Sequence, residues 1–274
     1  MNQSMISAAS SMNGIQRKLD IVADNMANLN TNGYKRKSAT FADVLTNVRQ
    51  HDKDYRLPGR ATPMGYTLGY GSYLTALSRD FTQGALKQTG VSTDFALEGN
   101  ALFELELDNG QSAWIREGAF HYTIDPNTKE KVLVTAQGDK VLDKDGAEIR
   151  IGLDQEIQVN DKGQVFATKN GLTVVPNPIA TLKVVKPISP ELLIQTENNY
   201  YVMAPNTNRN AIVEDLDLTQ NQAVHVRQGM IEQSNVSLID EMNDLIQAQR
   251  AYQMSARALT SGDAMWGLAN NLRA

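Results

Sequence analysis

Both ends of this 274-residue chain carry a seven-residue apolar repeat, and no other feature of the sequence constrains the fold as strongly. Apolar side chains that recur at steps of three and four lie along one side of an α-helix, as they do in a coiled coil. The repeats predict one helix from about Gln3 to Asn30 and a second helix from about Ser237 onward. In the second repeat, Gln249 and Asp263 interrupt the apolar series. The predicted interface positions are Met5, Met12, Ile15, Leu19, Val22, Met26 and Leu29 in the first helix and Leu238, Met242, Leu245, Tyr252, Leu259 and Trp266 in the second.

The surroundings of the first repeat indicate a helix that is contacted by protein on several sides. The positions flanking the repeat are small or uncharged, with one charged exception, whereas a dimeric coiled coil usually carries Glu and Lys there. Gly14 lies in the middle of this helix, where glycine costs about 1 kcal/mol relative to alanine. An isolated helix has nothing against which to bury its apolar repeat, so we expect the two ends to become ordered on assembly.

The residues between the two ends predict short strands joined by tight turns. Phe103 and Leu105 alternate with Glu104 and Glu106, which is the period of a strand, and turn pairs such as Asn109-Gly110 recur at short intervals. Short strands at this spacing predict an all-β barrel or sandwich. The whole chain is therefore predicted to have a mixed α+β fold, in which long N- and C-terminal helices, paired like a coiled coil, bracket an all-β middle.

We expect four parts along the chain. They are an N-terminal helix at residues 1–35, an extended stretch at residues 36–75, a β-rich region at residues 76–226 and a C-terminal helix at residues 227–274. The β-rich region is expected to have an inner part, residues 76–95 and 190–226, and an outer domain, residues 96–189. Ser237 followed by Asp240 resembles a capping box and predicts the start of the C-terminal helix.

Composition excludes several classes of protein. The formal net charge of -5 argues against nucleic-acid binding, which favours a clustered basic surface. The chain has no cysteine, hence neither a disulfide framework nor thiolate chemistry. No apolar run approaches the length of a transmembrane helix, and the N-terminus does not resemble a cleavable signal peptide, because its first basic residue is Arg17 and serines interrupt the apolar residues. On these features alone, we expect a soluble cytoplasmic protein.

The sequence shows no motif for catalysis or for cofactor binding. His51, His121 and His225 are far apart in the chain, and no pair of them has the spacing of a metal motif. The segment from Asp143 to Gly146 is predicted to be a turn, because the calcium-loop pattern around it lacks the required carboxylates. We therefore expect no metal, no cofactor, no small-molecule substrate and no enzymatic activity. An enzyme whose distant residues converge in the β region remains an alternative.

Three segments resemble the signature regions of the bacterial flagellar rod and hook family. Residues 23–36 are similar to an Asn- and Ala-rich helix end that leads into Thr-x-Gly-Tyr-Lys, and residues 116–120 resemble an Arg-x-Gly-x-Phe strand entry. The third segment runs from Gln228 to Tyr252. The motif positions at the two ends are Asn25, Asn28, Thr31, Gly33, Tyr34, Lys35, Ser234, Asn235, Val236, Glu241, Met242, Gln249, Arg250, Ala251 and Tyr252.

The resemblance implies a structural subunit of the flagellar basal-body rod. Such a subunit self-assembles through its terminal helices into a rigid tubular drive shaft that links the motor to the hook. Its implied partners are copies of itself, other rod and hook proteins and the flagellar type III export apparatus, with neither nucleic acid nor a small-molecule substrate among them. Export by that pathway requires no cleavable signal peptide, so the expected location changes from the cytoplasm to the basal body, outside the cytoplasmic membrane.

Within the family, the sequence favours the distal rod. The chain is too short for an additional outer domain, and Phe41 to Tyr73 resembles the extended insertion of distal rod members. The alternatives are a hook or proximal-rod subunit of the same family and, outside the family, a subunit of a non-flagellar filament or adhesin.

Overall fold

The chain folds into two compact units, each described by itself. The computed structural model describes residues 2–43, 46–50, 65–69, 71–107, 109–126, 128–169, 172–173, 177–205, 207–218 and 223–272. The helical unit comprises residues 1–27, 37–78 and 237–274, and the β unit comprises residues 28–36 and 79–236. Each unit is therefore assembled from segments that are distant in the sequence. Much of the predicted insertion from Phe41 to Tyr73, namely residues 44–45, 51–64 and 70, lies outside the described residues.

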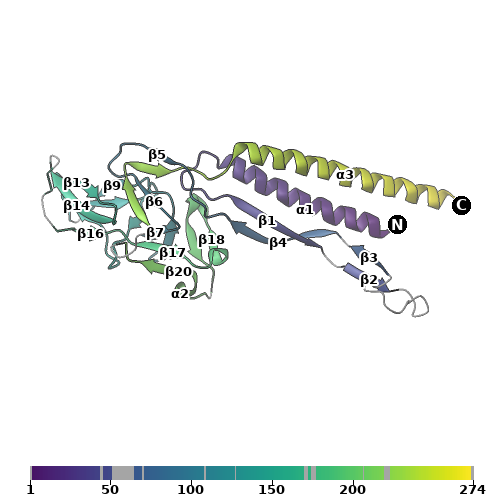
Figure 1. Ribbon diagram of the computed structural model, residues 1–274, viewed down its shortest axis with the longest axis horizontal. Coiled ribbons are helices and arrows are strands. Elements are labelled where there is room, and N and C mark those ends of the chain that lie inside the picture. Colours follow the sequence, from purple (N-terminus) through teal and green to yellow (C-terminus); the bar gives the residue numbers. More distant parts are fainter. Residues whose placement is uncertain are drawn as a thin grey trace. The chain divides into compact units, whose positions relative to one another are not determined.

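Two long antiparallel helices form most of the helical unit (Figure 1). They are α1 (Asn2–Ala27) and α3 (Leu238–Asn271). Asn25 near the end of α1 bonds Glu241 near the start of α3, whereas Met5 lies against Gly262 at the opposite ends. A Cβ on Gly262 would lie only 3.2 Å from Met5 Cγ, so glycine permits the close approach of the helices there. No described helix combines the length and the apolarity that a membrane crossing needs.

The helix boundaries follow local capping. Ser237 is the N-cap of α3 and its hydroxyl accepts the Asp240 N–H at 3.5 Å, as the capping prediction requires. Helix α1 ends at Ala27, three residues before the predicted Asn30. The chain turns there because the following segment, up to Gly33 with its φ of +65°, bonds to the β unit, to which it belongs.

Two strand pairs complete the helical unit, within the stretch predicted to be extended. Strand β1 (Lys37–Asp43) pairs with β4 (Ser72–Arg79), and β2 (Thr46–Gln50) pairs antiparallel with β3 (Gly65–Gly69). A Cβ on Gly14 of α1 would lie 3.2 Å from Ser72 O and 3.7 Å from the Phe41 ring. The mid-helix glycine is thus explained, since α1 contacts α3 on one side and the β1–β4 pair on another.

In its described residues, the β unit contains many short strands, the short helix α2 and two 3-10 helices at Pro190–Leu192 and Glu197–Asn199. The strands and α2 are β5 (Leu86–Gln88), β6 (Phe95–Glu98), β7 (Leu102–Glu106), β8 (Ser112–Ile115), β9 (His121–Ile124), β10 (Lys131–Val134), β11 (Lys140–Val141), β12 (Arg150–Ile151), β13 (Glu156–Val159), β14 (Gln164–Lys169), β15 (Leu172–Thr173), β16 (Ala180–Thr181), β17 (Val184–Pro187), β18 (Leu193–Gln195), β19 (Tyr201–Met203), α2 (Arg209–Ile212), β20 (Val213–Leu216), β21 (His225–Gln228) and β22 (Met230–Glu232).

The largest sheet of the β unit has the strand order β12-β10-β11-β7-β8-β19-β18. Strand β9 joins it at β10, while β17 pairs with both β7 and β20. A second sheet contains β13, β14, β15 and β16, and the pairs β21–β6 and β22–β5 lie outside both sheets. The path of the largest sheet is open in the described residues. The predicted β-rich middle between two terminal helices is thus confirmed, whereas a closed barrel is not.

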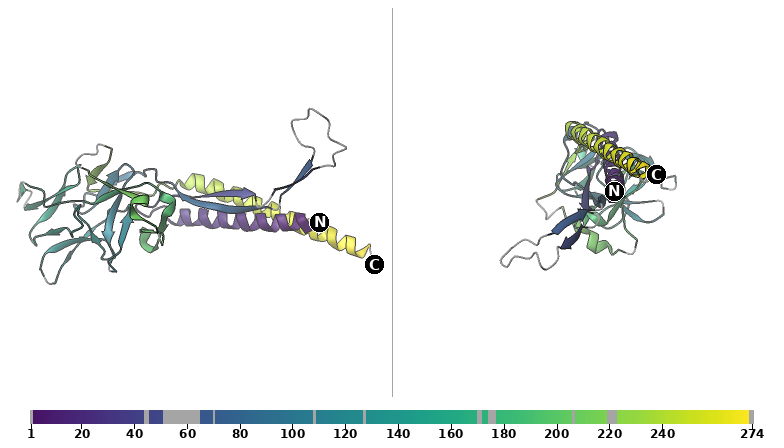
Figure 2. Two further views of the ribbon diagram at one scale, coloured as in Figure 1. Left: turned by 90° about the horizontal axis from the view of Figure 1, so that it is seen from below. Right: turned by 90° about the vertical axis from the view of Figure 1, so that its right-hand side faces the viewer.

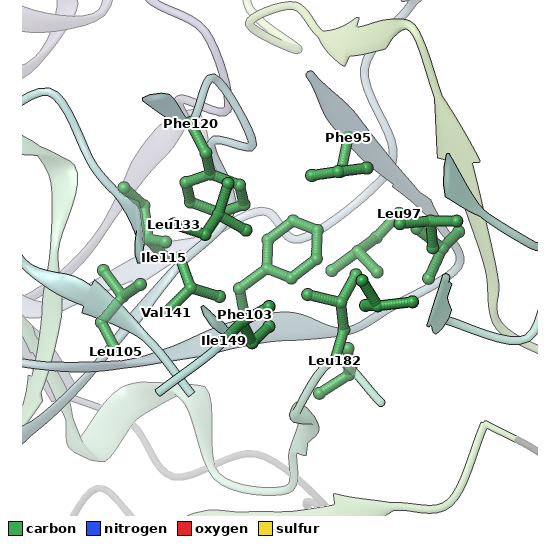
Figure 3. Packing of buried hydrophobic residues seen from close by; sticks show 14 of the residues in the cluster. Phe95, Leu97, Phe103, Leu105, Ile115, Phe120, Leu133, Val141, Ile149 and Leu182 are labelled. Carbon is green, nitrogen blue, oxygen red and sulfur yellow. The ribbon is translucent and has the colours of Figure 1, made fainter. Parts of the chain in front are cut away.

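The main core of the β unit is built around three phenylalanine rings (Figure 3). Phe103 and Phe120 meet edge to face with ring centroids 5.3 Å apart, and the centroids of Phe95 and Phe120 lie 6.0 Å apart. A second cluster on the other side of β7 contains Leu102, Trp114 and Tyr201. Strand β7 therefore contributes apolar side chains to two cores.

Candidate assembly interface and motif cluster

Residues from all three motif segments meet in a buried ion-pair triad inside the β unit. Lys35 Nζ lies 2.8 Å from Glu232 Oε1, and Arg116 Nε lies 2.5 Å from Glu232 Oε2. Each of these side chains is at most 2% exposed. We call Lys35, Arg116, Glu232 and Asn235 the motif cluster.

The remaining polar atoms of the triad are satisfied by backbone groups. Lys35 Nζ donates to Thr82 O at 2.8 Å, and Arg116 donates to the carbonyls of Ala101 and Leu97. Glu232 Oε1 also accepts the Gly84 N–H at 2.8 Å. Such saturation is what a buried charge requires, because each charge loses its hydration.

Burial lowers the pKa of the Lys35 ammonium, and the nearby Arg116 lowers it further. Glu232 opposes both effects by attracting the charged form of Lys35. The triad thus contains two cations and one carboxylate, so Glu232 supplies the only negative charge within the triad.

Asn235 connects the same segments through its amide. Its Oδ1 accepts the Arg36 N–H at 2.8 Å, and its Nδ2 donates to Asp80 O at 2.8 Å and to Thr82 O at 3.1 Å. The backbone adds a 2.8 Å bond from Gly33 N–H to Glu232 O. One asparagine therefore holds together the residues that follow α1 in sequence, those that follow β4 and those that precede α3.

Two motif glycines are required by close packing. A Cβ on Gly33 would lie 2.6 Å from Glu117 N, and a Cβ on Gly118 would lie 1.7 Å from Phe95 O. Phe120, two residues after Gly118, is buried in the main core. The Arg-x-Gly-x-Phe segment thus supplies a buried charge, a close backbone approach and a core ring.

In the helical unit, Asn25 and Glu241 form a buried polar pair between α1 and α3. Asn25 Nδ2 donates to Glu241 Oε2 at 3.2 Å and to Lys37 O at 2.9 Å, while Asn25 Oδ1 accepts the Lys37 N–H at 2.9 Å. Asn25 and Glu241 are 1% and 0% exposed. A buried polar pair in a helical interface specifies register, because any shift would leave its groups unpaired.

The interface positions predicted on α1 lie on its covered side. Val22 is buried, and the half-buried positions are Met5, Met12, Ile15, Leu19, Met26 and Leu29, the last of which follows the helix. Lys18 on the same helix forms a 3.6 Å ion pair with Asp244 of α3. Helix α3 covers part of this side of α1.

On α3, the predicted interface positions lie on two sides of the helix. Leu245, Tyr252 and Leu259 are half-buried, whereas Leu238, Met242 and Trp266 are exposed. The other column of the covered side consists of Glu241, Ala248, Ser255 and Gly262. Gln249 and Asp263, which interrupt the predicted apolar series, are exposed. The positions that face α1 are the preceding residues, Ala248 and Gly262.

The other motif positions have separate roles. Thr31 Oγ1 donates to Asn28 Oδ1 at 3.1 Å, and Tyr34 and Val236 are buried in the β unit. Ser234 is half-buried, as is Ala251, whereas Gln249 and Arg250 are exposed on α3.

Sequence reasoning did not identify the partners of the charged motif residues. The available signal was that each of the three motif segments contains a charged residue, Lys35, Arg116 or Glu232, beside apolar or small neighbours. Among the described residues, no group of three or more His, Cys, Asp or Glu side chains is placed to hold a metal ion.

Three family models match successive parts of the chain. "Flagella basal body rod protein" matches residues 5–35, "Flagellar hook protein FlgE/F/G D1 domain" matches residues 96–167, and "Flagellar basal body rod FlgEFG protein C-terminal" matches residues 227–272. These matches contain the three motif segments described above, apart from Arg36.

Similar proteins align along the whole chain. The flagellar basal-body rod protein FlgG of Borreliella burgdorferi is 30% identical over 100% of this chain and 99% of its own length. The flagellar hook-basal body complex protein FlhP of Bacillus subtilis is 32% identical over 100% of both chains, and FlgG of Agrobacterium fabrum is 33% identical over 94% of both. These are structural proteins of the rod and hook and not enzymes. The chain therefore belongs to the flagellar basal-body rod and hook family and is a structural subunit of the rod.

Proposed function

We propose that this rod subunit occupies the distal rod and assembles with copies of itself through α1 and α3 into a rigid tube that links the motor to the hook. Membership of the family implies a basal-body location and assembly with other rod and hook proteins. Beyond this, we propose that the subunit self-associates, occupies the distal position, is exported by the flagellar type III apparatus and lies outside the cytoplasmic membrane.

The observation that carries the proposal is the exposed apolar surface at the start of α3. Leu238, Ile239, Met242 and Ile246 are between 43% and 73% exposed, although they lie within two turns of the buried Glu241. Covering a large apolar side chain completely is worth about 1.5–3 kcal/mol, so a contiguous set favours association strongly. A helix pair with one covered side and one exposed apolar side is suited to packing against further helices.

The distal position is supported by relatives and by length. Two of the similar proteins described above are rod proteins named FlgG, and the chain spans 94–99% of their length. The predicted insertion around residues 46–65 is the feature expected to stiffen the tube. Deleting residues 46–65 is expected to give a more flexible, hook-like tube, and a deletion tube that stays straight and rigid contradicts the distal assignment.

Disruption of the gene, scored by motility and by electron microscopy of basal bodies, tests the rod function. We expect non-motile cells whose basal bodies end before the hook. Motile cells with normal hooks contradict the proposal where the genome carries no second copy of the gene.

The helical interface is tested by complementing the disrupted strain with Met242→Asp/Ile246→Asp. The matched control is Asn243→Asp/Gln247→Asp, which adds the same charge at exposed, polar positions of the same turns. We expect the first variant to be exported but not incorporated, because two carboxylates oppose burial of this surface, and the control to restore motility. Equal motility of both strains contradicts assembly through this side of α3.

A further inference from the structure

Strand β13 lies at the border of the second sheet, where β14 is its strand partner (Figure 2, teal strands). Their hairpin closes with the Asn160 N–H donating to Gln164 O at 3.1 Å. Backbone groups of an antiparallel strand point alternately to its two sides, so those of Ile157 and Val159 point away from β14. Both residues are buried, and their backbone groups therefore need partners within the protein.

The side-chain amide of Gln228 supplies such partners. Its Nε2 donates to Ile157 O at 2.8 Å, and its Oε1 accepts the Val159 N–H at 3.0 Å. The Ile157 N–H donates to the Tyr122 hydroxyl at 3.2 Å. Gln228 thus offers β13 one donor and one acceptor, as the backbone of a neighbouring strand would.

The bonds of Gln228 continue a backbone link between β21 and β13. The two strands lie side by side, and the Val226 N–H donates to Asp161 O at 3.0 Å. After Gln228 the backbone turns towards other partners, because Gly229 has a φ of +73° and its N–H donates to Asp94 O at 2.8 Å. The side chain of Gln228 therefore bonds β13 where the backbone of β21 no longer does.

The same amide also reaches the loop before β6. Its Nε2 donates to Ser92 O at 2.7 Å, so Nε2 and Oε1 together make three bonds to the backbone of the protein. Two residues after Gln228 begins β22, which carries Glu232 of the motif cluster and leads towards α3. Gln228 thus joins the second sheet, this loop and the segment that leads into α3.

Other links hold the second sheet at the hairpin end of β13. There, Asp161 O accepts the Val226 N–H and Gly163 O accepts the Leu182 N–H. Along the rest of β13, the side chains of Ile157 and Val159 pack in the main core. Hydrophobic packing is non-directional, whereas hydrogen bonds have preferred distances and angles. A directional link in the middle of β13 therefore opposes pivoting about the hairpin end.

We propose that the Gln228 amide locks the second sheet to the segment that leads into α3, so that the two open and move as one unit. The amide acts in place of the strand-to-strand bonds that β21 and β13 lack beyond Val226. In a rod, this lock prevents slip inside each subunit under load, a use that rests on the proposed function.

Hydrogen exchange on the purified full chain tests the lock with Gln228→Met, which keeps the length of the side chain and removes its amide. Three amides report the result. Val159 bonds Gln228 itself, Ile179 bonds a β14 carbonyl at 2.8 Å, and Phe95 bonds a backbone carbonyl at 2.9 Å in the main core. We expect exchange of Val159 and Ile179 to accelerate together, on the order of tenfold, because the second sheet then opens separately. Exchange of Phe95 is expected to stay unchanged.

The matched control is Gln158→Met, the same chemical change at an exposed position of β13. We expect wild-type exchange at all three amides in this variant. Gln228→Glu is a second test, because it keeps an acceptor for the Val159 N–H and loses the donor to Ile157 O. It is expected to accelerate the same two amides, and circular dichroism confirms that each variant is folded.

Two outcomes overturn the lock. Faster exchange of Val159 alone shows a local bond, and equal acceleration of Val159, Ile179 and Phe95 shows that Gln228 stabilises the whole β unit. Because these measurements use the isolated chain, either outcome leaves the rod function intact. Motile cells with normal hooks after gene disruption contradict the rod function instead and leave the lock in place.

Discussion

Lys35 and Glu232 form a 2.8 Å ion pair across 197 residues of sequence, and both side chains are almost completely buried. The pair unites the motif that follows α1 with the motif that precedes α3. Arg116 joins it from the strand entry between them. The segments that connect with helices α1 and α3 are thus held together inside the β unit by charges that water does not reach.

Glu232→Gln is expected to lower the free energy of unfolding by about 3–5 kcal/mol, because two buried cations lose their counter-charge. Urea unfolding of the full chain, followed by the fluorescence of the buried Trp114, measures the change. The control is Asp217→Asn, which removes a carboxylate from a more exposed pair with Lys144 and is expected to have little effect. Similar midpoints for the two variants contradict a structural role for the triad.

Tyr201→Phe is expected to stabilise the chain at neutral pH by about 1–3 kcal/mol, the cost of burying an unpaired polar group. The Tyr201 hydroxyl is buried and finds no hydrogen-bond partner among the described residues. The neighbouring Tyr200→Phe is the control, since its hydroxyl bonds Thr135 Oγ1 and Gln137 Oε1 at 2.9 Å. That variant is expected to lose stability in the same urea titration, and a loss for both variants refutes the interpretation of Tyr201.

Alkaline pH provides a second readout of the same substitution. Burial raises the pKa of Tyr201 to about 12, whereas a tyrosine in the unfolded chain ionises near 10. The folded state therefore favours the protonated phenol of Tyr201. This pH-dependent part of the free energy of unfolding is complete below pH 10 and is lost as the pH rises from 10 towards 12. Tyr201→Phe should remove this part of the alkaline decline.

The sequence was sufficient to predict the features that depend on local pattern. The heptad spacing predicted both terminal helices, and Ser237 with Asp240 predicted where α3 begins. Turn pairs such as Asn109-Gly110 predicted a β-rich middle. These signals act over a few residues, so they are readable without knowledge of the tertiary structure.

Features that depend on distant partners were not predictable. The alternation around Glu104 predicted a strand but no partner for its carboxylate, which is 1% exposed and pairs with Arg209 of α2 at 2.6 Å. Likewise, Glu241 was placed outside the apolar series of α3, although Asn25 makes it part of the covered side. Charged residues that are buried with a partner look like surface residues until the partner is known.

Gly33→Ala is expected to destabilise the β unit more than Gly90→Ala does. Both glycines have positive φ, +65° and +73°, so alanine strains the backbone by about 1–2 kcal/mol at either position. Only at Gly33 would the new Cβ also meet backbone, 2.6 Å from Glu117 N, whereas nothing lies within 4 Å at Gly90. Urea unfolding of the two variants isolates the contact, and equal losses contradict it.

Asn25→Leu is expected to weaken the helix pair, with a cost of about 1–3 kcal/mol for each buried group left unpaired. Lys37 would lose both backbone bonds to the side chain, and Glu241 would lose a donor. Thermal melting of helical circular dichroism and motility of the complemented strain report the effect. The control is Gln16→Leu on the exposed side of α1, and if it impairs melting equally, added hydrophobicity rather than the lost pair is responsible.

Hydrogen exchange on the dilute chain should show two regimes. Within α1 and α3, only a few residues such as Val22, Asn25, Glu241 and Ala248 are buried, so most helical amides are expected to open readily and exchange fast until subunits assemble. The amides of Gly33 and Gly84 bond the buried Glu232 of the motif cluster and are expected to exchange with the slow core of the β unit. Exchange of the assembled rod should then slow along both helices while the motif cluster stays unchanged. Well-protected helical amides in the dilute monomer show instead that α1 and α3 are ordered before assembly, and that association selects a surface which already exists.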